Sequence, residues 1–228
     1  MNYENFVSSK RLSTKYFGFE VEIDKVSPVL FDFQKQIVQW ALKLGRAAIF
    51  ADTGLGKTGM QLTWASHIAN KTGGNVLILA PLCVAHQTVN EGKKFDVEVN
   101  YCRSQDQVKS GVNITNYEML KNFDVSTFSG IVLDESSILK SYMGKTKREI
   151  IEACQAVEYR LACTATPSPN DYLELGNHAE FLGIMPSNEM IIRFFQNDTM
   201  EAGTYVLKAH AATKFWEWCL DTGVTLDG

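Results

Sequence analysis

The sequence predicts an α/β protein in which helices cover both faces of a parallel β-sheet. Short apolar runs without polar alternation recur along the chain, among them VLILAP at 76–81 and GIVL at 130–133. Segments of helix length separate these runs, and a glycine-rich loop, ADTGLGKT at 51–58, directly follows one of them. Strands that are apolar on both faces are typical of parallel sheets. Such sheets bind ligands beyond the carboxyl ends of their strands, so the polar residues after each strand are the candidates for a site.

Composition sets broad limits on the function. The chain has 228 residues, 45% apolar and 21% charged, which is enough for one large or two small domains. A formal net charge of -4 does not support a broad basic surface for nucleic acid, although it leaves room for a local groove. The five cysteines contain no C-x-x-C pair, so we expect free thiols in a reducing cytoplasm. The first residues lack the apolar core of a signal peptide. Apolar runs in the sequence are all shorter than the ~18 residues that a membrane-spanning helix needs. The expected location is the cytoplasm of a bacterium or of a phage-infected cell, without a membrane partner.

The first predicted elements lie before residue 46. Residues 19–23 alternate apolar and acidic side chains, which predicts a half-buried strand. Residues 1–27 are accordingly expected to form a strand or hairpin extension. Pro28 interrupts this pattern, and residues 31–44 then carry apolar side chains at helical spacing, with Gly45 as a plausible stop.

Apolar runs and helical periods alternate through the rest of the chain. Strands are predicted at 47–51, 76–81, 97–101, 112–116, 130–135 and 159–167, and helices at 57–70, from 82 to about 95 and around 150–151. After Pro167 only helices are predicted, at 171–183, 188–195 and 209–220. These should pack on the same lobe as a C-terminal helical extension. Within the last of them, Phe215, Trp216 and Trp218 either face the core or leave an exposed apolar patch.

The stretch ADTGLGKT is interpreted as a phosphate-binding loop. Its two glycines allow a tight turn and a close approach of the backbone to phosphate. Lys57 can reach the outer phosphates, Thr58 can offer a hydroxyl to Mg²⁺, and the helix behind them directs its positive end at the same point. Ala51 stands in place of the usual first glycine and is small enough for the turn from strand to loop. An incidental glycine-rich turn is the alternative, and the order of strand, G-K-T and helix disfavours it. The predicted nucleotide contacts are Asp52, Thr53, Gly54, Leu55, Gly56, Lys57 and Thr58.

Two further strand ends complete the predicted site. Asp134 ends an apolar strand, so its carboxylate should emerge beside Thr58 and hold Mg²⁺. Glu135 follows it and is placed to accept a proton from an attacking water, a role that a phosphotransferase would not need. A charged pair that merely ends a strand is the alternative. Thr164 and Thr166 end the last strand and carry hydroxyls that can bond the carboxylates or the phosphate region.

In this order, the motifs resemble the first RecA-like lobe of superfamily 2 helicases and translocases, a P-loop NTPase fold. Within that superfamily they most resemble the Swi/Snf-type, DEAD/DEAH-like branch. The resemblance covers residues 28–185, which we expect to form the ATP-binding lobe, with 186–228 as the helical extension. It is carried by LFDFQKQIVQW (30–40), ADTGLGKT (51–58), APLCVAHQ (80–87), DESSILKS (134–141) and RLACTATPSPNDYLELGNHAEFLG (160–183).

The resemblance implies ATP and Mg²⁺ as cofactors and hydrolysis of ATP as the activity. By that resemblance Gln34 would recognise the adenine edge, and Lys57 and Thr58 would hold phosphate and Mg²⁺. Asp134 would complete the metal site and Glu135 would activate water. Thr164 and Thr166 would couple the nucleotide state to a nucleic-acid groove.

The resemblance also implies a nucleic-acid partner, with duplex DNA as the expected form. Residues matching motifs that touch the nucleic-acid backbone are Pro81, Leu82, Thr115, Asn116 and Tyr117, although Pro81 can equally end a strand and Tyr117 can equally pack in the interior. One departure is visible, because Ser136 and Ser137 stand where relatives often carry Ala and then His or Asp. The departure leaves hydrolysis intact but puts its coupling to nucleic acid in question.

Nothing after residue 185 resembles the second RecA-like lobe, whose arginines reach the γ-phosphate in such proteins. We therefore expect weak ATP binding and slow hydrolysis from this chain by itself, with a second lobe supplied in cis or in trans. Two alternatives remain open. One is an ATP-dependent conformational switch without processive translocation, and the other, disfavoured by Gln34 and T-A-T-P, is an unrelated P-loop phosphotransferase.

Overall fold

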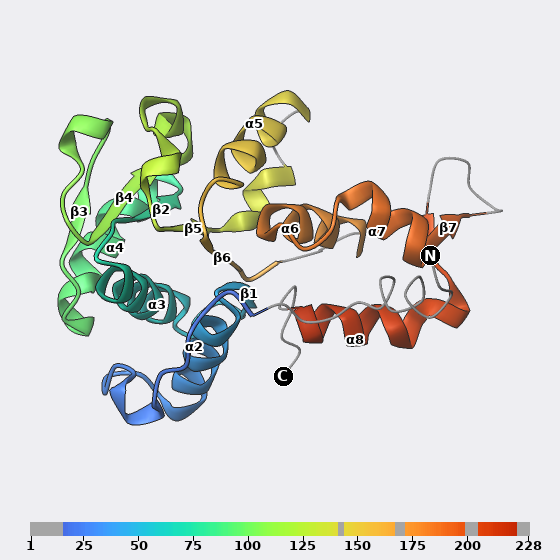
Figure 1. Cartoon of the computed structure of the whole chain (residues 1–228), viewed down its shortest axis with the longest axis horizontal. Coiled ribbons are helices and arrows are strands. Elements are labelled where there is room, and N and C mark those ends of the chain that lie inside the picture. Colours follow the sequence, from blue (N-terminus) through green and yellow to red (C-terminus); the bar gives the residue numbers. More distant parts are fainter. Residues whose placement is uncertain (1–15, 141–143, 167–171, 199–204, 223–228) are drawn as a thin grey trace, which may run out of the picture.

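The computed structural model describes residues 16–140, 144–166, 172–198 and 205–222. Its centre is a six-stranded sheet in which every pairing is parallel, and the strands lie in the order β1-β6-β5-β2-β4-β3 (Figure 1). This arrangement confirms the α/β fold with a parallel sheet. The strands are β1 (Arg46–Phe50), β2 (Val76–Ala80), β3 (Val99–Tyr101), β4 (Val112–Asn116), β5 (Gly130–Asp134) and β6 (Tyr159–Thr164).

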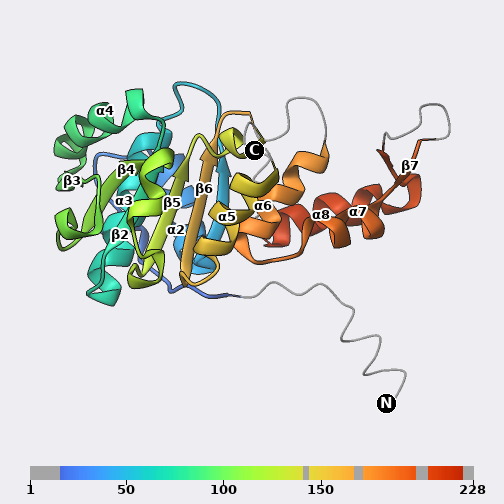
Figure 2. The ribbon, with the colours of Figure 1, turned by 90° about the horizontal axis from the view of Figure 1, so that it is seen from above.

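Helices cover both faces of the sheet, as Figure 2 shows from above. On one face α2 (Asp32–Leu44), α3 (Lys57–Thr72) and α4 (Leu82–Gly92) pack over side chains such as Ile49 and Ile78. On the other face α5 (Gly144–Cys154), α6 (Leu175–Leu182) and short 3₁₀ turns between 117 and 127 cover the alternate side chains, such as Ala48 and Leu77. The alternation along each strand therefore divides the core into two apolar layers.

Glycines in the left-handed conformation set the ends of two helices on the first face. Gly45 has φ of 73° and its N–H closes α2 on the carbonyl of Ala41. Gly73 has φ of 67° and ends α3 in the same way on Ala69. A residue with a Cβ adopts this conformation only at an energetic cost. The glycines at these two positions therefore determine where α2 and α3 end.

The segment before α2 is not a strand, and the prediction of a strand at 19–23 is wrong. The N–H groups of Phe17 and Phe19 donate to the carbonyls of Leu44 (2.9 Å) and Leu42 (3.0 Å), which the end of α2 leaves without helical partners. Phe19 and Val21 still pack against the first apolar layer, so the alternating pattern reports burial and not pairing. A short 3₁₀ turn follows at Ile23–Lys25, and residues 1–15 lie outside the described part.

The C-terminal part contains α7 (Ser187–Phe194) and α8 (Ala212–Thr222), which form a third apolar cluster with α6. The prediction of helices alone after residue 167 is wrong in one respect, because β7 (Phe195–Asn197) and β8 (Tyr205–Leu207) pair as an antiparallel hairpin. α6 belongs to two clusters: Phe181 and Leu182 face the sheet, and Leu175 and Ala179 face α7 and α8.

The aromatic residues of α8 largely face this third cluster. Phe215 is fully buried and Trp218 is 2% exposed, and both rings lie within about 6 Å of Phe194. Trp216 is half-buried and meets Tyr172 edge to face. The core-facing alternative therefore holds for Phe215 and Trp218, and the exposed patch does not form from them.

Candidate nucleotide-binding and hydrolysis site

The glycine-rich loop joins β1 to α3 with backbone conformations that only glycine adopts freely. Gly54 and Gly56 have φ of 89° and 79°. A Cβ on Gly56 would lie 2.3 Å from Nε2 of Gln34, whereas a Cβ on Gly54 would meet nothing within 4 Å. The space beside Gly54 is thus open, and that beside Gly56 is filled by Gln34.

Gln34 ties the start of α2 to this loop. Its side chain is 6% exposed; Nε2 donates to the carbonyl of Leu55 (2.8 Å) and Oε1 accepts from the N–H of Phe31 (2.9 Å). The Gln34 side chain keeps one amide proton and one oxygen lone pair that these two bonds do not use. It can therefore donate one hydrogen bond to the edge of a nucleotide base and accept another from it. Close by in sequence, the rings of Phe31 and Phe33 stack in parallel at 6.2 Å and are 70% and 44% exposed.

Lys57 folds back onto the loop that precedes it. Its Nζ donates to the carbonyls of Ala51 (2.8 Å) and Asp52 (3.3 Å), which places an ammonium group within the turn. The charge of Lys57 also lowers the pKa of Asp134, so the two groups lie within electrostatic reach of each other.

The end of β5 presents the two predicted carboxylates. Asp134 is 5% exposed, and burial raises its pKa to about 6. The charge of Glu135 also contributes to this raised pKa, while hydrogen bonds from the Gln61 side chain and the Glu135 backbone and the charge of Lys57 oppose it. A buried carboxylate of this kind gains most from a cation placed beside it.

Thr164 lies between the loop and Glu135 because β6 is inserted between β1 and β5. Its carbonyl accepts from the N–H of Ala51 (3.2 Å), and its hydroxyl points at Oε2 of Glu135 from 3.5 Å. The N–H of Thr166 donates to the same hydroxyl at 3.1 Å, and Thr166 itself is exposed. The structure therefore brings Lys57, Asp134, Glu135 and Thr164 together at one edge of the sheet.

The oxygen donors at this edge suit Mg²⁺. Magnesium prefers hard oxygen ligands and is usually held by one or two protein groups together with phosphate. Thr58, next to Lys57, offers a half-buried hydroxyl and Asp134 a carboxylate. Gln61 is fully buried, and its side chain lies close enough to Asp134 for hydrogen bonding with it to lower the pKa of that carboxyl group. In the described ranges no group of three or more His, Cys, Asp or Glu residues could hold a metal by itself.

The residues predicted to touch nucleic acid lie in two different environments. Leu82 is 55% exposed at the start of α4 and Pro81 is half-buried before it. Thr115 is fully buried, Asn116 is 3% exposed and caps the next turn by accepting from the N–H of Met119 (3.0 Å), and Tyr117 is 5% exposed. The side chains at 115–117 therefore do not present a contact surface, and packing in the interior is what the structure shows for Tyr117.

Sequence reasoning missed Gln61 and His178 in this region, and it named Tyr117 only for a nucleic-acid contact or for packing in the interior. Gln61 stands four residues after Lys57, so the helical repeat could have placed it on the same side of α3. Tyr117 donates its hydroxyl to the carbonyl of Asp134 at 2.8 Å, and His178 bonds Ser136 through Nε2 at 2.9 Å. No local pattern signals these two contacts, because their partners lie 17 and 42 residues away.

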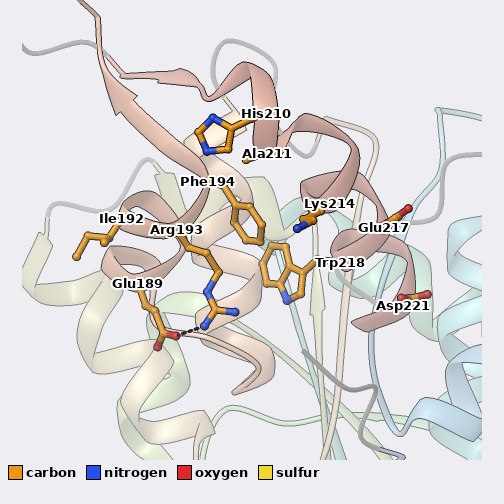
Figure 3. Close-up of a pocket in the computed structure, with 10 residues that line it drawn as sticks. All are labelled: Glu189, Ile192, Arg193, Phe194, His210, Ala211, Lys214, Glu217, Trp218 and Asp221. Atoms are coloured by element: carbon orange, nitrogen blue, oxygen red, sulfur yellow. Dashed lines mark hydrogen bonds and ion pairs between the residues drawn. The ribbon is translucent and has the colours of Figure 1, made fainter. Parts of the chain in front are cut away.

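A separate cavity of about 830 Å³ lies between α7 and α8, away from the glycine-rich loop (Figure 3). Phe194 and Trp218 form its apolar side, and its rim carries charges of both signs, including Arg193 and Lys214 against Glu217 and Asp221. None of the predicted site residues lines it. This cavity is therefore separate from the candidate site.

The remaining sequence expectations concern thiols and membranes. The five cysteines are all free, with Cys83 exposed and the other four buried. Within the described ranges, none of the helices combines the length and the apolar character that crossing a bilayer requires.

Comparison with known proteins identifies related chains. The family model of the SNF2-related domain matches residues 33–205. Over 175 residues the chain is 28% identical to protein p41 of Acyrthosiphon pisum secondary endosymbiont phage 1, a match that covers 66% of this chain and 38% of that protein.

Solved structures share the fold. The Sulfolobus solfataricus SWI2/SNF2 ATPase core domain matches with a TM-score of 0.66 at 19% identity, over 93% of this chain and 47% of that one. The same core in complex with dsDNA matches with a TM-score of 0.57 at 20% identity, over 81% and 41%. The UvsW helicase from Bacteriophage T4 matches with a TM-score of 0.56 at 15% identity, over 82% and 66%. The chain spans less than half the length of the phage protein p41 and of the Sulfolobus chain.

Proposed function

Because the chain belongs to the SNF2-related domain family, we propose that it forms the ATP-binding and hydrolysing lobe of a DNA-dependent translocase or helicase. The observation that carries the proposal is the convergence of Lys57, Asp134, Glu135 and Thr164 at one edge of the sheet. We assign the lobe to residues 28–185 and the helical extension to 186–228.

The phosphate-binding step uses the loop and the helix behind it. On binding, the phosphates replace the carbonyls of Ala51 and Asp52 as partners of Lys57, since a phosphate oxygen is a stronger acceptor for an ammonium group. The N–H groups at the start of α3 point toward the same place, and the helix dipole favours the negative charge. The part of the loop that surrounds the phosphates consists of Asp52, Thr53, Gly54 and Leu55. Gln34 holds this part in place through its hydrogen bond to the carbonyl of Leu55, and its second amide proton donates to the adenine edge.

The hydrolytic step relies on the end of β5. Thr58 and Asp134 would hold Mg²⁺, which supplies charge neutralisation of the phosphates when bound. Glu135 accepts a proton from the attacking water, and Thr164 holds the Glu135 carboxylate through its hydroxyl. Thr164 also contacts the loop, because its carbonyl accepts a hydrogen bond from the N–H of Ala51. Binding or loss of the phosphates is therefore transmitted through Thr164 to Glu135 and Thr166.

The partner is duplex DNA, a proposal supported by the family and by the dsDNA complex of the Sulfolobus core. Pro81 and Leu82 are the candidates for contact, since they lie at a strand end and Leu82 is exposed. A second RecA-like lobe, in cis or in trans, supplies the arginines that complete the site. The proposed location is the cytoplasm of a bacterium or of a phage-infected cell, which the phage relative supports.

The test compares Mg-ATP binding and ATP hydrolysis in the wild-type chain, Lys57→Ala and Glu135→Gln. Lys57→Ala should abolish binding, whereas Glu135→Gln should bind ATP normally and lose roughly 10²-fold or more in hydrolysis, the usual contribution of a general base. When the second lobe is supplied, duplex DNA should stimulate the wild-type rate. An ATP-dependent switch without translocation would instead bind ATP and DNA while DNA leaves the hydrolysis rate unchanged. Equal hydrolysis by wild type and Glu135→Gln would contradict the assignment of the base.

A further inference from the structure

Glu135 occupies a backbone conformation that a residue with a side chain rarely adopts. Its φ is 52°, and among the described residues only Asp96 shares a positive φ without being glycine. Such a conformation is costly for an L-residue and persists only where surrounding contacts hold it. The contacts around Glu135 therefore decide where its carboxylate points.

On the strand side, three hydrogen bonds hold the peptide units around Glu135. Its N–H donates to Oδ1 of Asp134 (3.1 Å), and its carbonyl accepts from the N–H of Ile138 (2.9 Å). The carbonyl of Asp134 accepts from the hydroxyl of Tyr117 at 2.8 Å in the buried interior. These bonds fix the residue before Glu135 and the turn after it.

On the helix side, the next residue is held by a side chain from α6. Oγ of Ser136 lies 2.9 Å from Nε2 of His178, and the two residues are 0% and 2% exposed. The ring of Phe50, at the end of β1, meets the His178 ring edge to face at 5.0 Å. His178 thus stands between the strand that leads into the phosphate loop and the turn that carries Glu135.

The Ser136–His178 contact is a neutral hydrogen bond. Burial lowers the pKa of His178 to about 4, with the backbone of Glu174 raising it slightly, so the ring carries no charge near neutral pH. A serine hydroxyl can donate to or accept from a neutral imidazole, so either tautomer can make the bond. A buried bond of this kind is directional, and breaking it leaves a polar atom without a partner.

We propose that His178 is a positioning residue for Glu135, which it holds in its left-handed turn through the hydroxyl of Ser136. The proposal rests on the function proposed above, because its consequence is the placement of the general base. Since α6 also packs against α7 and α8, the same bond makes the direction of Glu135 depend on how the helical extension sits. The competing explanation is that His178 only stabilises the fold. A positioning role predicts a lower rate of ATP hydrolysis with unchanged Mg-ATP affinity, whereas a structural role lowers both.

The experiment measures Mg-ATP affinity by equilibrium binding and hydrolysis by single turnover with the full chain in excess over labelled ATP. The variants are His178→Phe, which keeps an aromatic ring but removes both ring nitrogens, Ser136→Ala, which removes only the Ser136–His178 bond, and the double substitution. His178→Gln retains an amide near the position of Nε2 and serves as the rescue. His210→Phe makes the same chemical change at an exposed position and is the control.

A loss of about tenfold in the hydrolysis rate, the size expected from one buried hydrogen bond, is predicted for His178→Phe and for Ser136→Ala. Mg-ATP affinity should change less than about twofold, the double variant should be no worse than either single one, and His178→Gln should recover most of the rate. Thermal unfolding of each variant shows whether it is folded at the assay temperature.

Two results would overturn the inference while leaving the proposed function standing. The first is wild-type hydrolysis by both single variants alongside loss in Glu135→Gln. The second is a parallel fall of affinity, rate and melting temperature that His178→Gln does not reverse, which is the mark of a structural role. A wild-type chain that shows no hydrolysis even when the second lobe is supplied overturns the proposed function, and this inference falls with it.

Discussion

Gly56 shows how one position serves both the backbone and a side chain. Its φ of 79° is costly for a residue with a Cβ, and that Cβ would lie 2.3 Å from Nε2 of Gln34. The amide of Gln34 would have to leave, and its bond to the carbonyl of Leu55 would be lost with it. The loop and the start of α2 are thus joined through a space that only glycine leaves free.

Gly56→Ala should therefore lower the free energy of unfolding by about 1–3 kcal/mol, combining backbone strain with one lost hydrogen bond. Gly54→Ala is the matched control, because its φ is also positive but its Cβ would meet nothing within 4 Å. Denaturant unfolding without nucleotide should rank Gly56→Ala below Gly54→Ala. Equal stability of the two variants would show that Gln34 moves aside without cost.

His178 gives the chain a defined dependence of stability on pH. The pKa of His178 is lowered by burial from 6.5 to about 4, so between these values the unfolded chain binds a proton that the folded ring does not. Stability contributed at this position therefore falls as the pH falls through that window. Asp134 acts in the opposite sense between 3.8 and about 6, since burial raises its pKa, so only a comparison of variants isolates the histidine.

We expect His178→Gln to remove this part of the pH dependence. Relative to the variant, the wild type should lose stability between pH 6.5 and about 4, by at most on the order of 3 kcal/mol from the size of the shift. Unfolding free energies measured across the window give the difference directly. Ser136→Ala keeps the histidine buried and should keep the wild-type slope. Parallel curves for wild type and His178→Gln would contradict the burial of a neutral ring.

At the C-terminal end of α2, an adjoining segment supplies the hydrogen bonds that the helix itself cannot make. The N–H groups of Phe17 and Phe19 serve the carbonyls of Leu44 and Leu42, and Gly18 passes close to the helix between them. A Cβ on Gly18 would lie 1.8 Å from the carbonyl oxygen of Leu42, a backbone atom that cannot turn away. The position therefore requires glycine because of close packing, although its φ is not positive.

Gly18→Ala should detach this segment from α2 and destabilise the chain by about 1–3 kcal/mol, the usual cost of overpacking. Amide hydrogen exchange at Phe17 and Phe19 should speed up selectively. Glu20→Ala, beside it, changes only an exposed ion pair with Lys43 and should have little effect on either measurement. Unchanged exchange in Gly18→Ala would show that the segment tolerates the extra atom.

The molecule as a whole brings the groups proposed for catalysis to one edge of its six-stranded sheet. The match to the Sulfolobus SWI2/SNF2 ATPase core domain covers 47% of that chain. In related phosphoryl-transfer systems an arginine finger contributes roughly 10³–10⁵ in turnover. In the proposed arrangement this chain supplies the lysine, the carboxylates and the hydroxyls, and a second lobe supplies the arginines. ATP binding and ATP turnover should therefore be separable.

We therefore expect the purified 228-residue chain to bind Mg-ATP weakly and to hydrolyse it very slowly, without separating DNA strands. Adding the second lobe should raise the rate by orders of magnitude and make it depend on duplex DNA. A steady-state ATPase assay with and without DNA checks both statements. Brisk, DNA-stimulated turnover by the chain alone would refute them.

Local sequence was sufficient for the six strands of the parallel sheet, most helix bounds and the loop, but it failed at residues 19–23 and at the β7–β8 hairpin. The strands predicted at 76–81, 112–116 and 130–135 agree with β2, β4 and β5 to within one residue, because strands buried on both faces carry their signal in consecutive residues. Gly45 and the loop glycines are equally local, since a left-handed backbone favours one residue type. These features predicted the parallel sheet and grouped the site residues at one edge.

Three-dimensional contacts decided the rest. The insertion of β6 between β1 and β5 puts Thr164 between the loop and Glu135. The end of α2 binds the N–H groups of Phe17 and Phe19, next to the 19–23 run that alternates as a strand would. His178 and Ser136 are 42 residues apart in the sequence, and no sequence repeat or regular spacing predicts their hydrogen bond. Periodicity reports which side chains are buried, but the partner of a buried polar group depends on which segments the folded chain brings together, and that is a property of the tertiary structure.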